Sequence, residues 1–305
     1  MAAAGFEIRG GGYRAEIAAA GAGLRLLEFE GRALTETWEL GSKPPLASGA
    51  ILAPWPNRIR DGHFRFDGID HQLELTEPGL GNAIHGFVRH REWELVDEKS
   101  DRVELAVGVG LHKGWPYPLR MTVVYSVDEN GLRVEYTAVN TGSIESPFGV
   151  GAHPYLRVGD VPLDECTLRL GAGTRLPLDP QRMLPSGPSE AVIGTEYDFT
   201  GHRSLQGVVL DTPFSALDSD PDGRCRHELR APDGTTTTLW TSRKFGWLQV
   251  FTADPDEGKA YPGRGRALAV EPMTCPPNAF DSGIDQIVLQ PGGRWSGDWG
   301  ITASR

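Results

Sequence analysis

Residues 121–136 read MTVVYSVDENGLRVEY, and this stretch decides the fold class. Apolar side chains recur at every second position over 121–127 and again over 132–136, as they do in a strand with one buried face. Between the two segments lies Asn130-Gly131, a pair that tolerates the positive φ of a tight turn. The stretch therefore predicts two antiparallel strands joined by a hairpin turn.

The same pattern recurs before and after this hairpin. Residues 63–75 alternate on both sides of an Asp-Gly pair at 67–68, and residues 226–240 do so around another at 233–234. Asp-Gly between two alternating segments is a strong hairpin signal. Several such hairpins in one chain indicate antiparallel sheets.

Helical periodicity is weak along the whole chain. The best candidate helix, Ala15–Leu27, is interrupted by Gly21 and Gly23 and fits two strands equally well. We therefore predict an all-β fold in which two packed sheets or a closed barrel bury the strand faces. No linker tract, charge block or repeat divides the sequence, so we expect a single domain over residues 1–305. The longest loops, which are rich in Pro, Gly and Asp and could cover a site, are 159–164, 176–194 and 253–266.

The composition is acidic, with 30 Lys and Arg against 41 Asp and Glu and a net charge of -11. Such a surface repels phosphate backbones and anionic lipids, so we expect neither a nucleic-acid nor a membrane partner. The apolar runs are shorter than the roughly 18 residues that a membrane-spanning helix needs. The N-terminal residues lack the basic and apolar segments of a secretory signal, so we expect a cytoplasmic protein. Cys166, Cys225 and Cys275 are far apart and match no metal-ligand spacing, so we expect reduced cysteines and no metal.

Polar stretches break the strand pattern at four places, namely 54–59, 82–86, 149–155 and 270–277. Glu271 is the strongest single candidate for chemistry, because it ends the apolar run 267–270 of a strand that is expected to be buried. Burial raises the pKa of a carboxyl group, which is how a general base is tuned. A lone histidine before Gly or Pro, such as His85 or His153, is more often a turn residue than a catalyst. A lone arginine such as Arg58 favours a surface ion pair.

Taken in order, these stretches resemble the aldose 1-epimerase (galactose mutarotase-like) family over residues 50–300. The motifs that carry the resemblance are Asn57-Arg58-Ile59, Asn82–Gly86, Gly114-Trp115-Pro116, His153-Pro154-Tyr155, Leu248–Thr252, Glu271–Thr274 and Leu289–Gly293. The resemblance implies a single large antiparallel β-supersandwich. It also implies an enzyme that interconverts the α and β anomers of a free aldose, so the expected partner is a monosaccharide. The sequence contains no phosphate loop, dinucleotide fingerprint or metal spacing, in agreement with a proton-transfer reaction that needs no cofactor.

The resemblance also implies roles for individual residues. Glu271 is expected to take the proton of the anomeric hydroxyl, and His153 to protonate the ring oxygen so that the hemiacetal opens to the aldehyde. His85 is expected to hydrogen-bond on the ring-oxygen side. The residues expected to hold sugar hydroxyls are Asn57, Arg58, Tyr155, Asp211 and Gln249, where the match of Asp211 rests on VLDTPF at 209–214.

Two alternatives stay open at this point. An epimerase of a hexose 6-phosphate or another anionic sugar needs a basic cluster at the far end of its pocket. Arg89 and Arg91 can supply one, although an arginine-flanked strand is more often a solvated face. The other alternative is a catalytically inactive sugar-binding module, but such a protein is expected to have lost Glu271 or His153. The oligomeric state is not readable from the sequence.

Overall fold

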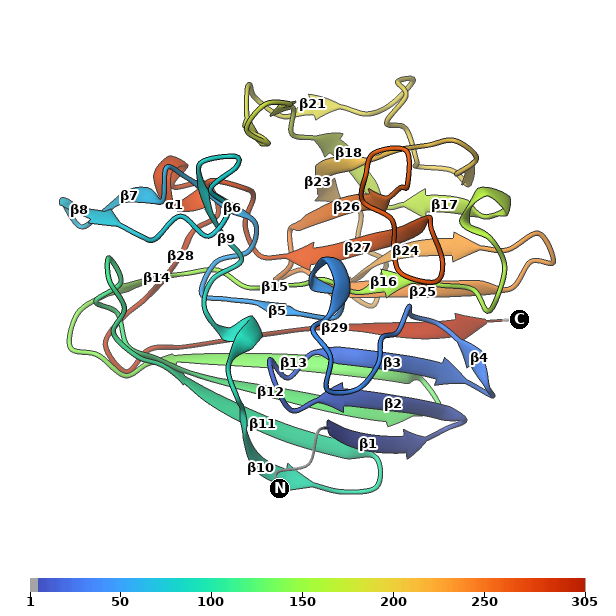
Figure 1. Ribbon diagram of the computed structural model, residues 1–305, viewed down its shortest axis with the longest axis horizontal. Helices are drawn as coiled ribbons and strands as arrows, with labels where there is room; N and C mark the ends of the chain where they lie inside the picture. Colours follow the sequence, from blue (N-terminus) through green and yellow to red (C-terminus); the bar gives the residue numbers. More distant parts are fainter. Residues whose placement is uncertain (1–4, 305) are drawn as a thin grey trace.

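Strands dominate residues 5–304, the part of the chain that the computed structural model describes (Figure 1). The prediction of an all-β fold is confirmed. The helical segments in this part are single turns, namely α1 (Ala279–Ser282) and the 3₁₀ turns η1 (Pro45–Ala47), η2 (Val88–His90) and η3 (Leu163–Glu165). None of these helices has the length and apolar character that a membrane span requires.

The larger sheet is antiparallel throughout. Its strands, in spatial order, are β10 (Glu94–Glu98), β11 (Arg102–Val109), β12 (Leu119–Asp128), β13 (Gly131–Asn140), β29 (Arg294–Ser304), β25 (Thr236–Ser242), β24 (Arg224–Arg230), β17 (Thr167–Leu170) and β22 (Arg203–Ser204). The predicted hairpin 121–136 forms β12 and β13, with Leu119 opposite Asn140 and Asp128 opposite Gly131. Buried positions alternate along β12, as the period-2 pattern predicts.

The smaller sheet lies beside the larger one and is also antiparallel. Its strands, in spatial order, are β21 (Glu190–Ala191), β18 (Ala172–Arg175), β23 (Asp211–Leu217), β26 (Trp247–Ala253), β27 (Ala267–Met273), β15 (Gly151–Ala152) and β5 (Ile51–Leu52). One further strand, β16 (Tyr155–Leu156), pairs with β27 next to β15. The central strand β27 is buried along its whole length, as its apolar sequence predicts.

Shorter sheets complete the architecture. An N-terminal sheet of β1 (Gly5–Gly10), β2 (Tyr13–Ala18), β3 (Leu24–Phe29) and β4 (Arg32–Ala33) packs against β11–β13 (Figure 1). The ambiguous segment 15–27 is therefore two strands and the turn between them. The two-stranded ribbons are β6 (Arg58–Arg60) with β9 (Asn82–Ile84), β7 (His63–Phe66) with β8 (Ile69–Gln72), β14 (Ser146–Phe148) with β28 (Ile287–Leu289), and β19 (Leu178–Asp179) with β20 (Leu184–Pro185).

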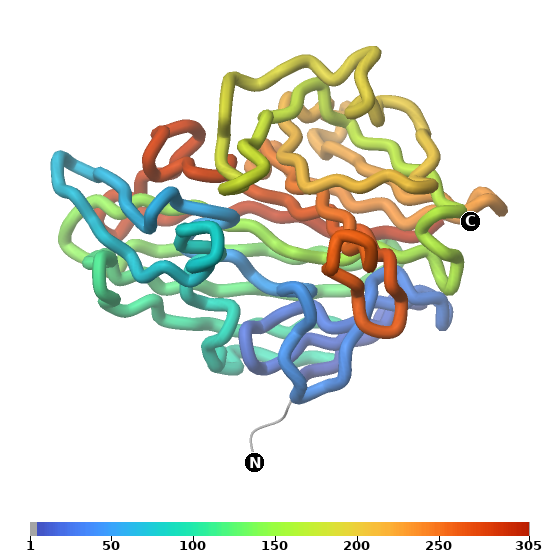
Figure 2. Tube along the Cα trace, turned by 45° about the horizontal axis from the view of Figure 1, so that its top comes forward, coloured from blue at the N-terminus to red at the C-terminus, as the bar shows by residue number. Residues whose placement is uncertain are grey.

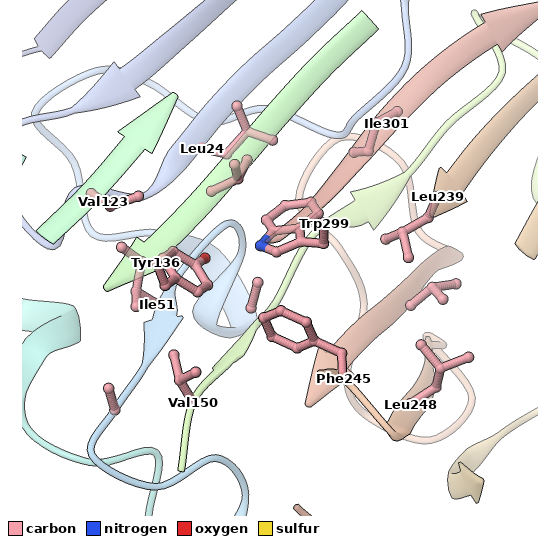
Figure 3. Packing of buried hydrophobic residues seen from close by; sticks show 14 of the residues in the cluster. Leu24, Ile51, Val123, Tyr136, Val150, Leu239, Phe245, Leu248, Trp299 and Ile301 are labelled. Carbon is pink, nitrogen blue, oxygen red and sulfur yellow. The ribbon is translucent and has the colours of Figure 1, made fainter. Parts of the chain in front are cut away.

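The main core is continuous across both large sheets. Trp299 on β29 and Tyr136 on β13 come from the larger sheet, whereas Leu248 on β26 and Ile51 on β5 come from the smaller one (Figure 3). Phe245, in the turn before β26, packs among them, and all five side chains are almost fully buried. Burial of one large apolar side chain contributes about 1.5–3 kcal/mol. This core makes the smaller sheet a rigid base for the polar residues on its other face.

Two of the predicted long loops leave the smaller sheet. Residues 253–266 connect β26 to β27 and protrude from the molecule as the orange loop of Figure 2. Residues 176–194 follow β18 and contain the short strands β19, β20 and β21. The first of these loops carries Lys259, which reaches the cavity described next.

Candidate active site

A cavity of about 280 Å³ opens over β26 and β27. The residues that line it are Leu46, Ala47, Asn57, Arg58, Thr76, Glu77, Ile84, His85, Arg89, His153, Asp211, Gln249, Phe251, Lys259 and Glu271. The structure thus brings seven of the eight predicted site residues together from six separate parts of the chain. Tyr155 is the exception.

Glu271 and His153 are in direct contact at the base of the cavity. Gly151 of β15 lies opposite Met273 of β27, and Tyr155 of β16 lies opposite Ala269. This register places His153, between β15 and β16, opposite Glu271. The Nε2 atom of His153 is 3.3 Å from the Oε1 atom of Glu271.

Burial favours the uncharged form of both members of this pair. It raises the pKa of Glu271 well above its ordinary value, and the nearby Asp211 carboxylate adds to the rise. Burial also lowers the pKa of His153 to about 3, and the charge of Arg89 acts in the same direction. Burial therefore favours a protonated carboxyl group beside a neutral imidazole, with one mobile proton between them.

One oxygen of Glu271 is available to a ligand. The Oε2 atom is buried and has no hydrogen-bond partner among the described residues. A buried carboxyl oxygen without a partner costs free energy unless a bound molecule satisfies it. Because Glu271 lines the cavity, this oxygen is a candidate contact for a polar group of a ligand.

His85 presents a hydrogen-bond donor to the same space. It follows β9, directly across the ribbon from Asn57, which precedes β6. The Asn57 amide N–H donates to the Nδ1 atom of His85 at 3.2 Å, and the His85 amide N–H donates to the Asn57 carbonyl at 3.0 Å. Because Nδ1 accepts a hydrogen bond, the neutral ring carries its proton on Nε2. Burial, with repulsion from His153, Arg89 and Arg58, lowers the pKa of His85 well below its ordinary value, so the ring stays neutral.

Gly86 explains why the chain can place His85 here. Its φ is 62°, and a Cβ atom at this position would lie 1.9 Å from the Ala53 carbonyl oxygen. The amide N–H of Phe87 donates to that same carbonyl at 2.7 Å. Only glycine permits so close an approach, which fixes the turn that carries His85.

A chain of amides and a carboxylate forms a second wall. The Nδ2 atom of Asn57 donates to Oε1 of Gln249 at 3.3 Å, and Nε2 of Gln249 donates to Asp211 at 2.6 Å. Gln249 on β26 lies directly opposite Glu271 on β27, so the two side chains share one face of the sheet. Burial raises the pKa of Asp211, partly offset by the charge of Arg58. The arrangement offers several donors and acceptors suited to sugar hydroxyls.

Arg58 is held by a residue that the sequence did not reveal. Its guanidinium group donates two hydrogen bonds to the carboxylate of Glu77, at 2.7 and 2.9 Å. The Arg58 side chain is nearly buried, so it is not the surface residue that a lone arginine suggests. Glu77 lies in the loop between β8 and β9 and belongs to no motif. Its only sequence signal is indirect, because a buried arginine requires an acidic partner.

Tyr155 lies behind His153 and does not line the cavity. Its ring stacks on the imidazole with 5.3 Å between centroids, and its hydroxyl donates to the Leu46 carbonyl at 3.3 Å. The structure therefore does not bring Tyr155 to the cavity with the other predicted site residues, and its contact with a sugar hydroxyl stays a prediction. Lys259 and Thr76 also line the cavity and carried no sequence signal, whereas Arg91, which was considered with Arg89, does not line it.

The described residues contain no group of three or more His, Cys, Asp or Glu side chains arranged to hold a metal ion. The cavity instead offers a carboxyl–imidazole pair, a neutral donor and a polar wall, which is an arrangement for moving protons on a polyhydroxylated molecule. The sequence model of the family described as aldose 1-epimerase matches residues 6–302. The chain belongs to the aldose 1-epimerase family.

Individual relatives agree with this assignment. The chain is 33% identical over 287 residues to the uncharacterized protein YihR of Escherichia coli K12, covering 94% of this chain and 89% of that protein. It is 27% identical over 265 residues to human galactose mutarotase, covering 80% of this chain and 75% of the human protein. Among solved structures, the aldose epimerase homologue from C. elegans superposes with a TM-score of 0.87 at 19% identity, covering 99% and 98% of the two chains. The predicted galactose mutarotase-like fold is thereby confirmed.

Proposed function

We propose that this protein is an active aldose 1-epimerase that interconverts the α and β anomers of a free aldose. The observation that carries the proposal is the contact between Glu271 and His153 in the cavity, with the Oε2 atom of Glu271 left without a partner. The hydroxyl and the ring oxygen of a hemiacetal are bonded to the same carbon, so both lie within reach of two side chains that are in contact with each other. One pair can therefore reach the hydroxyl and the ring oxygen of one hemiacetal.

The reaction follows from the single mobile proton of the pair. Transfer of that proton from Glu271 to Nε2 of His153 produces a carboxylate and an imidazolium ion. Glu271 then takes the proton of the anomeric hydroxyl, and its O–H electron pair forms the carbonyl. The bond between the anomeric carbon and the ring oxygen breaks with both electrons on that oxygen, which receives the proton of His153. The pair ends as it began, with a carboxyl group and a neutral imidazole.

Reclosure repeats these steps in reverse. Rotation about the bond between C1 and C2 presents the other face of the aldehyde, and ring closure gives the opposite anomer. His85 donates its Nε2–H on the ring-oxygen side and, being neutral, does not compete as an acid. Asn57, Gln249, Asp211 and the paired Arg58 hold sugar hydroxyls.

The alternative of a sugar-binding module without activity receives less support. A binding module needs the polar wall but has no need of a buried carboxyl–imidazole pair, which costs free energy of desolvation. Here Glu271 and His153 are both present and in contact.

Exchange between anomers at equilibrium tests the proposal directly. NMR saturation transfer between the two anomeric signals gives the exchange rate with and without protein. The sugars are glucose, galactose and xylose, and the derivatives of the two hexoses that are phosphorylated or oxidised at C6. We expect acceleration for at least one sugar and its loss in Glu271→Gln. Binding of sugars without accelerated exchange of any of them would support the binding module instead.

A further inference from the structure

The cations around the cavity are unequally neutralised. Three Arg or Lys side chains line it, and among the described residues only Arg58 has a carboxylate hydrogen-bond partner, Glu77. The side chains of Arg89 and Lys259 make no hydrogen bond or ion pair with any residue of the described chain. The carboxyl groups nearby are already engaged or disfavoured as charges. Glu77, whose charge also acts on Arg89, is bound by Arg58. Asp211, on which Lys259 acts, is bound by Gln249, and burial disfavours the charged forms of both Asp211 and Glu271.

Arg89 is held in place through its backbone. It lies on η2, whose first residue, Val88, donates to the Ala53 carbonyl at 3.3 Å. On the other side, the Gly21 amide donates to the Arg91 carbonyl at 2.7 Å, and a Cβ atom on Gly21 would lie 2.4 Å from the Arg89 carbonyl oxygen. The turn is thus fixed between two parts of the fold, and it brings to the cavity an arginine whose side chain makes no hydrogen bond or ion pair within residues 5–304.

Arg89 lies on the imidazole side of the cavity. Its positive charge acts on both His85 and His153 and lowers the pKa of each. Lys259 instead acts on Asp211: its ammonium group is 5.3 Å from the centre of the Phe251 ring, and its charge lowers the pKa of Asp211. The charge of Arg89 therefore acts on the imidazoles and that of Lys259 on the polar wall.

The bonds of the sugar ring oxygen determine which substituent lies near Arg89. His153 faces the ring oxygen in the proposed reaction, and that oxygen is bonded to C5, which carries C6. A substituent at C6 therefore extends from the imidazole side, where Arg89 lies. A guanidinium group is suited to bidentate contacts with phosphate, sulfate or carboxylate.

We infer that the substrate is an aldose with an anionic group at C6, which Arg89 binds directly while Lys259 adds to the positive potential. The inference rests on the proposed function and adds the class of substrate to it. Because the net charge of the chain is -11, most of its surface repels anions. A positively charged cavity in such a protein is therefore stronger support for an anionic ligand. Phosphate, sulfate and carboxylate share the chemistry that Arg89 recognises.

Anomer exchange measured on matched sugars tests the inference. Glucose is compared with glucose 6-phosphate, glucose 6-sulfate and glucuronate, and the uncatalysed rate of each sugar is subtracted. Wild-type protein is expected to show kcat/KM at least about 10-fold higher for one of the anionic sugars than for glucose, and the three arms identify the anion. Arg89→Met should lower that preference about 10–100-fold, corresponding to the loss of one charged hydrogen-bonding partner. Arg89→Lys keeps the charge and should retain most of the preference.

Arg91→Gln is the matched control, because Arg91 is on the same turn but is exposed and does not line the cavity. It should leave the preference unchanged. Equal kcat/KM for glucose and all three anionic sugars would overturn the inference but leave the epimerase proposal standing. An equal decrease in kcat/KM for glucose and for the anionic sugars in Arg89→Met would also overturn the inference and leave the epimerase proposal standing. Absence of exchange for every sugar would overturn the proposed function, and the inference with it.

Discussion

The imidazole of His153 contacts the carboxyl group of Glu271 because β15 and β16 pair with β27 on either side of the contact. Backbone pairing, not a flexible loop, sets the distance between the two groups. A pair of side chains that is fixed in this way loses little conformational freedom when a ligand binds.

The pair gives the first prediction. Glu271→Gln keeps the size of the side chain and removes the base, and His153→Asn removes the group that protonates the ring oxygen. Each variant should lower kcat by about 10²–10⁴. Because both groups act on one proton, the double variant should fall by less than the product of the two effects. Near-wild-type anomer exchange in Glu271→Gln, measured by NMR saturation transfer, would assign the base to another residue.

The pH dependence of kcat should be broad. The pair works with one mobile proton, and it gains a second only when pH falls toward the pKa of His153, at about 3. Activity should therefore show no loss near 6.5, the ordinary pKa of histidine. As pH rises through the raised pKa of Glu271, the pair loses its proton and kcat falls, which gives the alkaline limb of the pH profile. Both limbs belong to the pair as a unit, so each should shift in the variants of either residue. An acidic limb centred near 6.5 would contradict the buried, neutral state of His153.

Much of the fold could be predicted because its signals are local. Alternation in residues 121–136 and the Asp-Gly turn at 67–68 each depend on neighbours in the sequence, and the structure bears both out. The hairpin turn between β12 and β13 nevertheless lies at residues 129–130, one position earlier than the Asn130-Gly131 pair suggests. Gly131 instead has a φ of 109° at the start of β13, where a Cβ atom would meet the Ile301 carbonyl oxygen of β29. Tertiary contact, not turn preference, explains this glycine.

The candidate site was predictable only where a residue belongs to a motif. Glu77 and Lys259 lie in loops whose sequences carry no pattern, and their places at the cavity depend on how distant strands pack. Tyr155 is the opposite case, a motif residue that does not line the cavity. Its motif puts it next to His153, but alternation along β16 and the bond from its hydroxyl to Leu46 turn it behind the imidazole. Proximity in sequence thus predicted the neighbourhood but not the direction of the side chain.

The Arg58–Glu77 pair should matter for stability as well as binding. Glu77→Gln removes the charge that compensates a nearly buried guanidinium group and leaves Arg58 with a weaker partner. We expect a loss of about 2 kcal/mol in the free energy of unfolding, measured by urea denaturation. Arg58→Met combined with Glu77→Gln removes both charges and should recover part of that loss. A double variant less stable than Glu77→Gln would show that packing by Arg58, not its charge, stabilises the site.

Cys275 should be inert in the folded protein. It lies four residues beyond Glu271, but its thiol is buried, and burial raises its pKa to about 12. Because the thiolate is the reactive form, iodoacetamide at pH 8 should label Cys275 slowly in the native protein and rapidly in urea. Cys275→Ser should retain anomer exchange within about threefold, in line with a packing role for a small buried side chain. Rapid native labelling with loss of activity would instead connect this thiol to the reaction.

His85 provides the sharpest test of how the site uses its protons. The hydrogen bond from the Asn57 amide to Nδ1 leaves Nε2–H as the donor, so His85 contributes a fixed hydrogen bond and not a proton. The amide nitrogen of glutamine can occupy the position of Nε2, so His85→Gln should keep kcat within about 10-fold of wild type. His85→Leu has similar bulk but no donor and should lose about 10²-fold, the usual cost of removing one such donor from an active site. The pH profile should be unchanged in His85→Gln, because a residue that stays neutral sets neither limb. Equal losses in the two variants, or a displaced limb in His85→Gln, would mean that His85 itself exchanges a proton with the sugar.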